Sequence, residues 1–268
     1  MDEFILNALR EDMPNGDITT DNIIPCDEVS HARFIAKEDG IVSGINIAKR
    51  VFELVGGEFT MEIYIDDGAF VRKGDIIARI QGKTRTILKG ERVALNILQR
   101  MSGIATETNR YVSLCEGNTK ILDTRKTVPN MRYFDKLAVT HGHGVNHRFS
   151  LSDMVMIKDN HIEAAGSITE AVNRCYGKVD CQIEVEVENI DMFKEALETP
   201  CDIIMLDNMS NDEMAECVKL NQGRKKLEAS GNMTLSRIRD VSLTGVDYIS
   251  VGAVTHSVKA LDISLKFK

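Results

Sequence analysis

Hydrophobic and polar residues in the first 90 positions of the chain follow two different spacings. Residues 3–10 and 45–55 carry apolar side chains at helical spacing. Residues 31–35, 58–65 and 75–81 are strand-like, and stretches such as DGIVSG and DDGAFVRKGD supply turn signals between them. The pattern predicts a small α+β unit at the N-terminus.

The segment IDDGAFVRKGDIIARIQG within this unit permits another interpretation, because it resembles the turn-rich strands of biotinyl and lipoyl carrier modules. Such modules present a lysine at a hairpin tip for covalent attachment. This region offers only Lys73 and Lys83, both in ordinary loop surroundings. We therefore favour the α+β unit over a carrier module.

The second half of the chain has a different period. Residues 91–111 have apolar side chains on one face, which predicts a helix that connects two domains. Beyond residue 115, short apolar strands alternate with amphipathic stretches in the manner of βα units. The candidate strands end near Asp123, Lys158, Glu186, Asp207, Ser230 and Gly252. Six such units without a glycine-rich dinucleotide loop favour an α/β barrel, complete or incomplete, over a doubly wound open sheet.

Composition narrows the class of protein. The 268 residues are 43% hydrophobic and 28% charged, as in ordinary globular enzymes and binding proteins. The first residues lack a signal-peptide pattern and no apolar run reaches about 18 residues, so we expect a cytoplasmic protein that does not enter membranes. The six cysteines have no CxxC spacing, which favours reduced, mostly buried thiols. A net charge of −8 argues against a nucleic-acid partner, so the expected ligand is small.

One stretch departs from this acidic background. Residues 123–161 contain six Lys or Arg against four Asp, a net charge of about +2, and four of the six histidines. The carboxyl ends of parallel barrel strands converge on one mouth. We therefore expect five cationic or ionisable side chains to meet there, where they would bind a carboxylate or phosphate: Arg125, Lys126, His147, Arg148 and Lys158. Surface ion pairing with the surplus acidic residues is the alternative.

Acidic side chains follow the next strands. Glu184, Glu186 and Glu188 share one face of a strand, and Asp207 ends the following strand. At a barrel mouth, Glu186 and Asp207 suit either of two roles, which are holding Mg²⁺ through oxygen ligands and stabilising positive charge on a substrate carbon. For Glu188 we favour simple exposure to solvent.

Two later turns predict phosphate binding. Ser230-Gly231-Asn232 and Gly252-Ala253 follow consecutive strands, where backbone N–H groups can bind an anion. His141, His143 and His147 form an HxHxxxH pattern that resembles a transition-metal site. We do not favour a metal there, because glycines flank His143 and because Arg148 would repel a divalent ion. We interpret His147 as an anion or ring contact, and His161 and His256 as structural or phosphate-side histidines.

With these motifs in order, the chain resembles the quinolinate phosphoribosyltransferase family over nearly its whole length. The motifs that carry the resemblance are GDITT (16–20), ERVALNILQRMSGIAT (91–106), DTRKTVP (123–129), NHRFSLSDMVMIKDNHI (146–162), VEVEN (185–189), IMLDNM (204–209), LEASG (227–231) and ISVGAVTHS (249–257).

The resemblance implies a type II phosphoribosyltransferase-like architecture. It comprises an N-terminal α/β sandwich over residues 1–97, joined by the C-terminal segment 258–268, and an incomplete, open α/β barrel over residues 98–257 that carries the active site. It also implies a homodimer, with a higher oligomer left open, in which Arg92 of one subunit enters the active site of the other.

The same resemblance implies the reaction and the roles of the residues. Phosphoribosyl is transferred from phosphoribosyl pyrophosphate to quinolinate with decarboxylation, which gives nicotinate mononucleotide, pyrophosphate and CO₂ in de novo NAD biosynthesis. Arg92, Arg125, Lys126, His147, Arg148 and Lys158 would serve quinolinate. Glu186 and Asp207 would face the ribose and Mg²⁺, which is held mainly through substrate and water. Ser230, Gly231, Gly252 and His256 would bind phosphate, and the expected catalytic residues are Lys126, Lys158, Glu186 and Asp207.

Some features depart from the family pattern. The loop THGHGVNHR has two histidines where glycine is usual, Phe149-Ser150 stands where a glycine is common, and ASGNM varies the double-glycine phosphate turn. Two alternatives follow, a homologue associated with molybdenum transport that acts on another substrate, and a non-catalytic protein that binds small anions. Retention of His147 and Arg148 and of the other cationic residues argues against the first.

Overall fold

The computed structural model describes residues 1–268, which divide into two compact units. The first unit comprises residues 1–109, 128–143 and 257–268, and the second comprises residues 110–127 and 144–256. The helix α4 (Thr84–Val112) begins in the first unit and its last three residues belong to the second. The boundary after residue 97 that the sequence suggested falls inside this helix. No helix of the chain is long and apolar enough to span a membrane.

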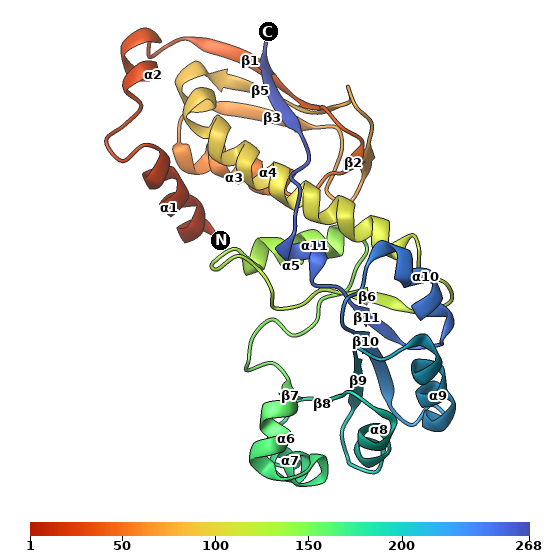
Figure 1. The fold of residues 1–268 in the computed structure, drawn as a ribbon. Coiled ribbons are helices and arrows are strands. Elements are labelled where there is room, and N and C mark those ends of the chain that lie inside the picture. The colour runs from red at the N-terminus through yellow and green to blue at the C-terminus, as the bar shows by residue number, and fades with distance from the viewer. The chain divides into compact units, whose positions relative to one another are not determined.

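A four-stranded antiparallel sheet forms the centre of the first unit, in the order β12-β1-β5-β3 (Figure 1). The C-terminal strand therefore pairs with the first strand of the chain. Besides α4, the elements of this unit are α1 (Asp2–Asp12), α2 (Ile18–Ile23), β1 (Val29–Ala36), β2 (Gly40–Ile41), α3 (Ile45–Val55), β3 (Phe59–Ile63), β4 (Phe70–Val71), β5 (Ile76–Lys83), α5 (Arg132–His141) and β12 (Ile263–Phe267). The α+β unit expected from the N-terminal pattern is confirmed.

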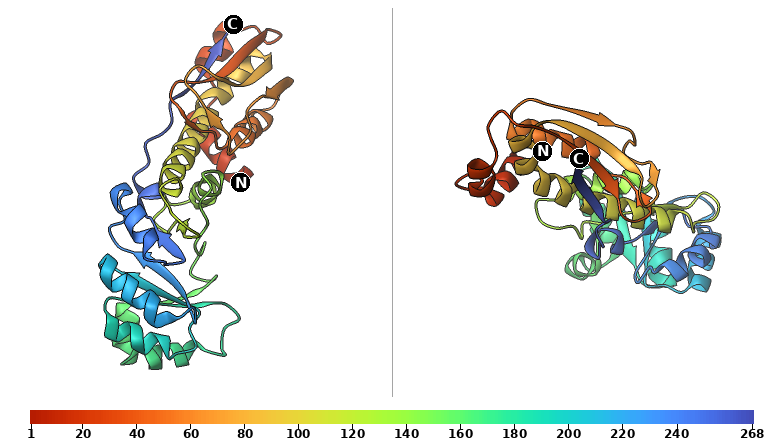
Figure 2. Two further views of the ribbon diagram at one scale, coloured as in Figure 1. Left: turned by 90° about the vertical axis from the view of Figure 1, so that its right-hand side faces the viewer. Right: turned by 90° about the horizontal axis from the view of Figure 1, so that it is seen from above.

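The core of the first unit lies between the sheet and the helices α3 and α4, which cover one face of the sheet (Figures 1 and 2). Phe52 of α3 connects these layers, since its ring centroid lies 6.2 Å from that of Phe34 and 6.1 Å from that of Phe59. Gly90 of α4 permits the close approach of the helices, because a Cβ at that position would lie 2.6 Å from the Phe52 ring. The fully buried Asp135 of α5 binds Arg100 of α4 through two hydrogen bonds of 2.9 and 2.8 Å.

The second unit contains a six-stranded parallel sheet in the order β6-β11-β10-β9-β8-β7. Its elements are β6 (Lys120–Leu122), β7 (Val155–Ile157), α6 (Asp159–Ala165), α7 (Ile168–Cys175), β8 (Ile183–Val187), α8 (Ile190–Leu197), β9 (Ile203–Asp207), α9 (Asn211–Asn221), β10 (Lys226–Ser230), α10 (Leu235–Leu243), β11 (Tyr248–Ser250) and α11 (Ala253–His256). The outermost strands β6 and β7 do not pair with each other. The expected α/β fold with an open barrel is therefore confirmed.

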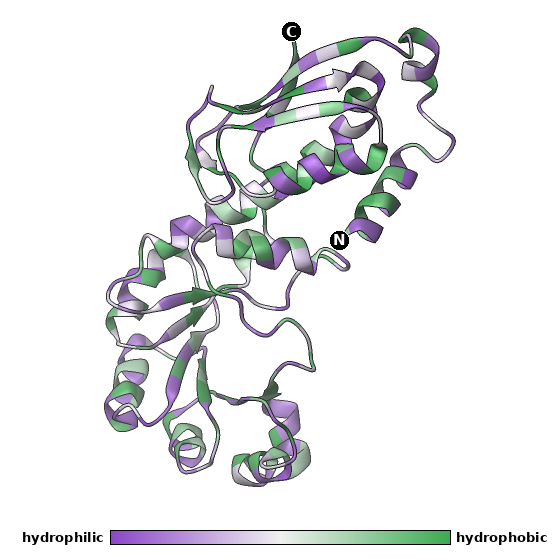
Figure 3. Ribbon diagram, turned by 180° about the vertical axis from the view of Figure 1, so that it is seen from behind, coloured by the Kyte–Doolittle hydropathy of each residue, from purple (hydrophilic) through white to green (hydrophobic).

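Burial explains why these segments form strands and helices. All but one residue of β8 and of β9 are buried, which is typical of parallel strands covered on both faces. The helices α7, α8 and α10 contact these strands and their neighbours, and they alternate hydrophobic and hydrophilic residues (Figure 3). Local sequence fixes some helix starts. Ser210, for example, precedes α9 and forms a capping box with Glu213.

All six cysteines are free. Cys201 and Cys217 are buried, Cys26 is exposed and the other three are intermediate. The expectation of mostly buried thiols was therefore too strong, because three of these cysteines lie at or near element ends where packing is incomplete.

Candidate active site

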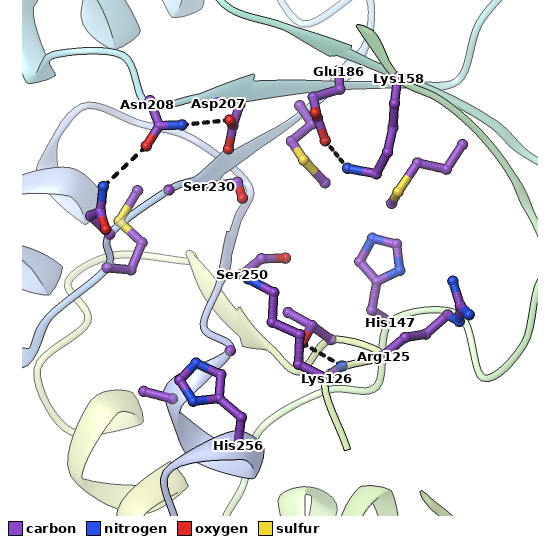
Figure 4. A pocket seen from close by; sticks show the side chains of 18 of the residues that line it. Arg125, Lys126, His147, Lys158, Glu186, Asp207, Asn208, Ser230, Ser250 and His256 are labelled. Atoms are coloured by element: carbon purple, nitrogen blue, oxygen red, sulfur yellow. Dashed lines mark hydrogen bonds and ion pairs between the residues drawn. The ribbon is translucent and has the colours of Figure 1, made fainter. Parts of the chain in front are cut away.

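A pocket of about 810 Å³ opens at the carboxyl ends of the parallel strands in the second unit (Figure 4). Eleven of the site residues expected from the sequence line it: Arg125, Lys126, His147, Arg148, Lys158, Glu186, Asp207, Ser230, Gly231, Gly252 and His256. Figure 4 shows Arg125, His147 and Lys158 on one side, Asp207, Asn208 and Ser230 on the other, and Lys126 between them. The pocket thus has a cationic side and a side built from acidic and turn residues.

Two arginines give the cationic side its character. Burial lowers the pKa of Arg148, and the nearby charge of Arg125 lowers it further. The Arg148 guanidinium donates to the carbonyl oxygen of Met154 at 3.1 Å and to the sulfur of Met156 at 3.5 Å. Neither contact neutralises its charge. Two neighbouring guanidinium groups in a partly desolvated pocket favour a ligand with negative charge.

Lys158 and Glu186 form an ion pair at the ends of β7 and β8. Lys158 directly follows β7, and its backbone N–H donates to Nδ1 of His161 at 3.0 Å at the start of α6. Glu186 lies on β8 with its side chain 13% exposed. The pair therefore joins the cationic side of the pocket to one of its carboxylates. Of the two roles considered for His161, structural and phosphate-side, its contact with Lys158 supports the structural one.

Asp207 contacts the phosphate-type turn through one residue that the sequence did not single out. Asn208 donates from Nδ2 to Oδ2 of Asp207 at 2.6 Å and accepts from Nδ2 of Asn232 at 3.3 Å. Its backbone N–H donates to the carbonyl oxygen of Ser230 at 3.0 Å. Asn208 and Asn232 both have positive φ, at 55° and 48°. Asn tolerates this conformation, and its occurrence directly after a strand was the available signal.

The turns after β10 and β11 need glycine for different reasons. Gly231 has a φ of +90°, and a Cβ there would lie 2.2 Å from Oδ1 of Asn208. At Gly252, a Cβ would lie 3.0 Å from the His256 ring and 3.2 Å from Cδ of Lys126. Both glycines let the backbone approach the pocket closely, as phosphate-binding turns require.

His147 lies at the inner wall of the pocket, with its side chain 7% exposed. Its Nε2 lies 3.1 Å from Oε2 of Glu184 and 3.3 Å from Oε2 of Glu228, and both carboxyl groups are fully buried. Its Nδ1 accepts the backbone N–H of Arg148 at 2.7 Å. Both ring nitrogens therefore contact the protein. Sequence reasoning placed Glu184 in the acidic row but gave no role to Glu228, whose signal was only its place in LEASG.

Burial and the contacts within this cluster shift the pKa values of Glu184 and His147. Burial raises the pKa of the Glu184 carboxyl, and the charge of Glu228 raises it further. Burial lowers the pKa of His147, but its hydrogen bonds to Glu184 and Glu228 outweigh this effect and raise it. Because Nδ1 accepts a hydrogen bond, the ring hydrogen lies on Nε2 and faces the carboxyl groups.

Two groups of residues have donor atoms close enough to be considered for a cation, and the first suits one better. Glu186 and Asp207 offer carboxylate oxygens to the pocket, and such oxygens suit Mg²⁺. The donor atoms of His147, Glu184 and Glu228 lie within 4.8 Å of one another, but the ring hydrogen on Nε2 already faces the two carboxyl groups. His141, from the HxHxxxH pattern, hydrogen-bonds through Nδ1 to Oγ of Ser43 at 2.8 Å.

Arg92 is the expected site residue that does not line this pocket. It lies on α4 in the first unit, and its side chain is exposed.

Comparison with known proteins identifies the family of this α/β-barrel protein. The model of the quinolinate phosphoribosyl transferase N-terminal domain matches residues 17–102, and that of the C-terminal domain matches residues 104–266. The chain therefore belongs to the quinolinate phosphoribosyltransferase family, as its motifs predicted.

Three relatives show the extent of the similarity. The chain is 48% identical to quinolinate phosphoribosyltransferase [decarboxylating] 1b of Nicotiana tabacum, over 97% of this chain and 80% of the relative. It is 43% identical to a probable nicotinate-nucleotide pyrophosphorylase of Bacillus subtilis, over 95% and 89% of the two chains. The crystal structure of NadC from Streptococcus pyogenes matches with a TM-score of 0.96 at 41% identity, covering 100% of this chain and 96% of that chain.

Proposed function

We infer that this protein is a pentosyltransferase that joins quinolinate to phosphoribosyl pyrophosphate and decarboxylates the product, giving nicotinate mononucleotide, pyrophosphate and CO₂ for de novo NAD biosynthesis. The observation that carries this inference is one pocket with neighbouring guanidinium groups of Arg125 and Arg148 on one side and Asp207 with the Gly231 turn on the other. Family membership supports the same reaction. Its volume of about 810 Å³ is large enough for two small substrates.

On the cationic side, we assign the two carboxylates of quinolinate to Arg125, Arg148 and Lys158. A guanidinium binds a carboxylate through two parallel hydrogen bonds, and an ammonium adds a point charge. His147 contributes the surface of its ring, since both ring nitrogens contact the protein. This arrangement requires both substrate carboxylates, so nicotinate, which has one, should be a poor substrate.

On the other side, we assign the phosphoribosyl group to the acidic residues and the turns. The 5-phosphate and pyrophosphate would contact backbone N–H groups around Gly231 and Gly252, with Ser230, His256 and Lys126 alongside. Glu186 and Asp207 lie where positive charge develops on the sugar as pyrophosphate departs, and their carboxylates stabilise that charge. Glu186 and Asp207 would hold Mg²⁺, which would screen the charge of the leaving group.

The chemistry needs no protein nucleophile. The ring nitrogen of quinolinate forms a bond to the anomeric carbon while the bond to pyrophosphate breaks, so the nitrogen becomes quaternary. The carboxylate next to that nitrogen then leaves as CO₂, because the cationic ring accepts the electron pair, and the ring carbon takes up a proton. Lys126 and Lys158 hold the two substrates in the relative position and orientation that the first step requires.

We also propose that the enzyme is a cytoplasmic homodimer in which Arg92 is donated across the interface. Arg92 is exposed on α4, so it is available to a second copy of the chain. A third guanidinium would complete the binding of a ligand with several negative charges.

Turnover separates this function from its alternatives. Purified protein is incubated with phosphoribosyl pyrophosphate, Mg²⁺ and either quinolinate or nicotinate, and nicotinate mononucleotide is measured by chromatography. We expect product from quinolinate and little from nicotinate. A non-catalytic anion-binding protein would bind quinolinate without forming product, and the molybdenum-associated alternative would convert neither acid.

A further inference from the structure

Two fully buried carboxyl groups lie under the pocket wall of the second unit, and their burial is unfavourable for the free energy of folding. Glu184 and Glu228 are 0% exposed. Neither oxygen of Glu184, nor Oε2 of Glu228, has a hydrogen-bond partner of good geometry. The cation-capable groups near Glu184 are the His147 ring, at 3.1 Å, and the Arg148 guanidinium, whose charge interacts with it. Burying carboxyl groups without full compensation is expensive. Apolar residues would serve a purely structural strand better, so these side chains need another explanation.

We propose that Glu184 and Glu228 are positioning residues for quinolinate binding, and that they act through His147 to hold Arg148 at the pocket wall. This inference rests on the proposed function, because it assigns a role within the same site. The two residues touch no substrate themselves.

The contacts of His147 show how the positioning works. Its ring is held by Glu184 of β8 and Glu228 of β10, and its backbone N–H donates to Oδ1 of the buried Asp123, after β6, at 2.8 Å. Residue 147 is thereby fixed to three separate strands. Residues 144–154 form no helix or strand beyond one β-bridge between Val145 and Leu122 of β6, so the contacts of His147 add to that single bridge in holding the loop. Ser250 in turn donates to Oε1 of Glu228.

The contacts of His147 position Arg148, which is the next residue in the chain. The Arg148 backbone N–H donates to Nδ1 of His147, so the orientation of the ring fixes the start of the Arg148 side chain. Arg125 and Arg148 repel each other when no anion lies between them. Without the fixed ring, this repulsion would move Arg148 away from the pocket and weaken binding of a dicarboxylate. The carboxyl groups that face the ring are those of Glu184 and Glu228, whereas Asp123 binds the backbone N–H of the same residue.

Replacement of Glu228 tests this role, because a positioning role and a purely electrostatic role predict opposite changes in the affinity for quinolinate. Removing a negative charge near an anion site should strengthen anion binding if charge alone matters. If position matters, Glu228→Met, which keeps the volume but loses the contact, should raise KM for quinolinate at least about tenfold. KM for phosphoribosyl pyrophosphate should change less than about twofold. The melting temperature should stay the same or rise, since a buried charge is replaced by an apolar side chain.

Two further variants complete the experiment. Glu228→Gln keeps the shape of the side chain and an oxygen in contact with Nε2 of His147, so KM for quinolinate should stay within about threefold of wild type. Glu188→Gln is the matched control, because Glu188 follows the same strand as Glu184 but is exposed and does not line the pocket. If Glu228→Met does not fold, Glu184→Met provides the same comparison.

The outcomes are distinct. An unchanged or lower KM for quinolinate in Glu228→Met, or an equal rise in both KM values, overturns the positioning role. If the wild-type protein itself does not convert quinolinate, the proposed function fails instead, and the two failures cannot be confused.

Discussion

Lys158 and Glu186 form an ion pair across the ends of β7 and β8, and this pair joins the two halves of the pocket. Lys158 is assigned to a substrate carboxylate and Glu186 to the ribose side. Each side chain must therefore exchange its partner for a substrate group when both substrates bind.

This relationship predicts the effect of Glu186→Gln. The change releases Lys158 from its carboxylate, so KM for quinolinate should stay the same or fall. It also removes a charge that stabilises the transition state, so kcat should fall by about 100-fold or more. Steady-state kinetics with each substrate varied will measure both values. Glu198→Gln, in an exposed pair with Arg224, is the control and should leave both values unchanged. If KM for quinolinate rises while kcat stays normal, Glu186 serves quinolinate and its assignment to the ribose side is wrong.

Replacement of Arg148 should affect binding more than folding. Arg148→Ala removes a charge-assisted contact worth about 1.5–3 kcal/mol, so KM for quinolinate should rise about 10- to 100-fold. The free energy of unfolding in urea should change by less than about 1 kcal/mol, because the hydrogen bonds that its side chain donates go to one carbonyl oxygen and one sulfur. Arg174→Ala, in an exposed pair with Glu170 on α7, is the matched control. Normal saturation by quinolinate would contradict the role given to Arg148.

The turn after β10 should not accept a side chain at Gly231. In Gly231→Ala, the new Cβ would lie 2.2 Å from Oδ1 of Asn208, so Asn208 or the turn must move. We expect KM for phosphoribosyl pyrophosphate to rise at least about tenfold while KM for quinolinate changes little. Gly223→Ala separates this effect from backbone strain, since Gly223 has a φ of +75° but nothing within 4 Å of the new Cβ. If the two variants have equal kinetic constants, the turn at Gly231 does not bind the phosphates of the substrate.

Mixing subunits tests the donated arginine. At quinolinate concentrations below the wild-type KM, Arg92→Ala and Arg148→Ala should each have little activity alone, because each weakens quinolinate binding at every active site. If Arg92 enters the site of the other subunit, mixed dimers contain one site with both arginines, and activity should recover to about a quarter of wild type. The two variants are mixed, unfolded and refolded together, with each variant refolded alone as the control. Absence of recovery in a dimer would place Arg92 in its own subunit's site or outside any site.

The sequence predicted the site best where strand ends determine positions. Lys158, Asp207 and Gly252 lie at or just beyond the ends of parallel strands, and the ends of such strands meet at one edge whatever the details of packing. Arg132 and Lys136 lie in the same cationic stretch, yet α5 carries them into the first unit. A count of charges along the chain could not separate these two groups, because the separation depends on how the chain crosses between units.

Side-chain direction explains most of what the sequence did not provide. Glu184 and Glu186 share a face of β8, but the first is buried against His147 and the second reaches the pocket. Glu228 contacts His147, and Asn208 contacts Asn232 in addition to its neighbour Asp207, and both His147 and Asn232 lie 20 or more residues away from these partners in the chain. Periodicity gives the face of a strand, whereas these contacts depend on tertiary packing.

The fate of one carboxylate tests the central claim most directly. Quinolinate labelled isotopically in the carboxylate next to the ring nitrogen is incubated with the protein, phosphoribosyl pyrophosphate and Mg²⁺, and labelled CO₂, pyrophosphate and nicotinate mononucleotide are measured together. The account predicts that the three products appear in equal amounts and that all of the label is in CO₂. Label retained in the nucleotide, or no nucleotide with quinolinate merely bound, would contradict it.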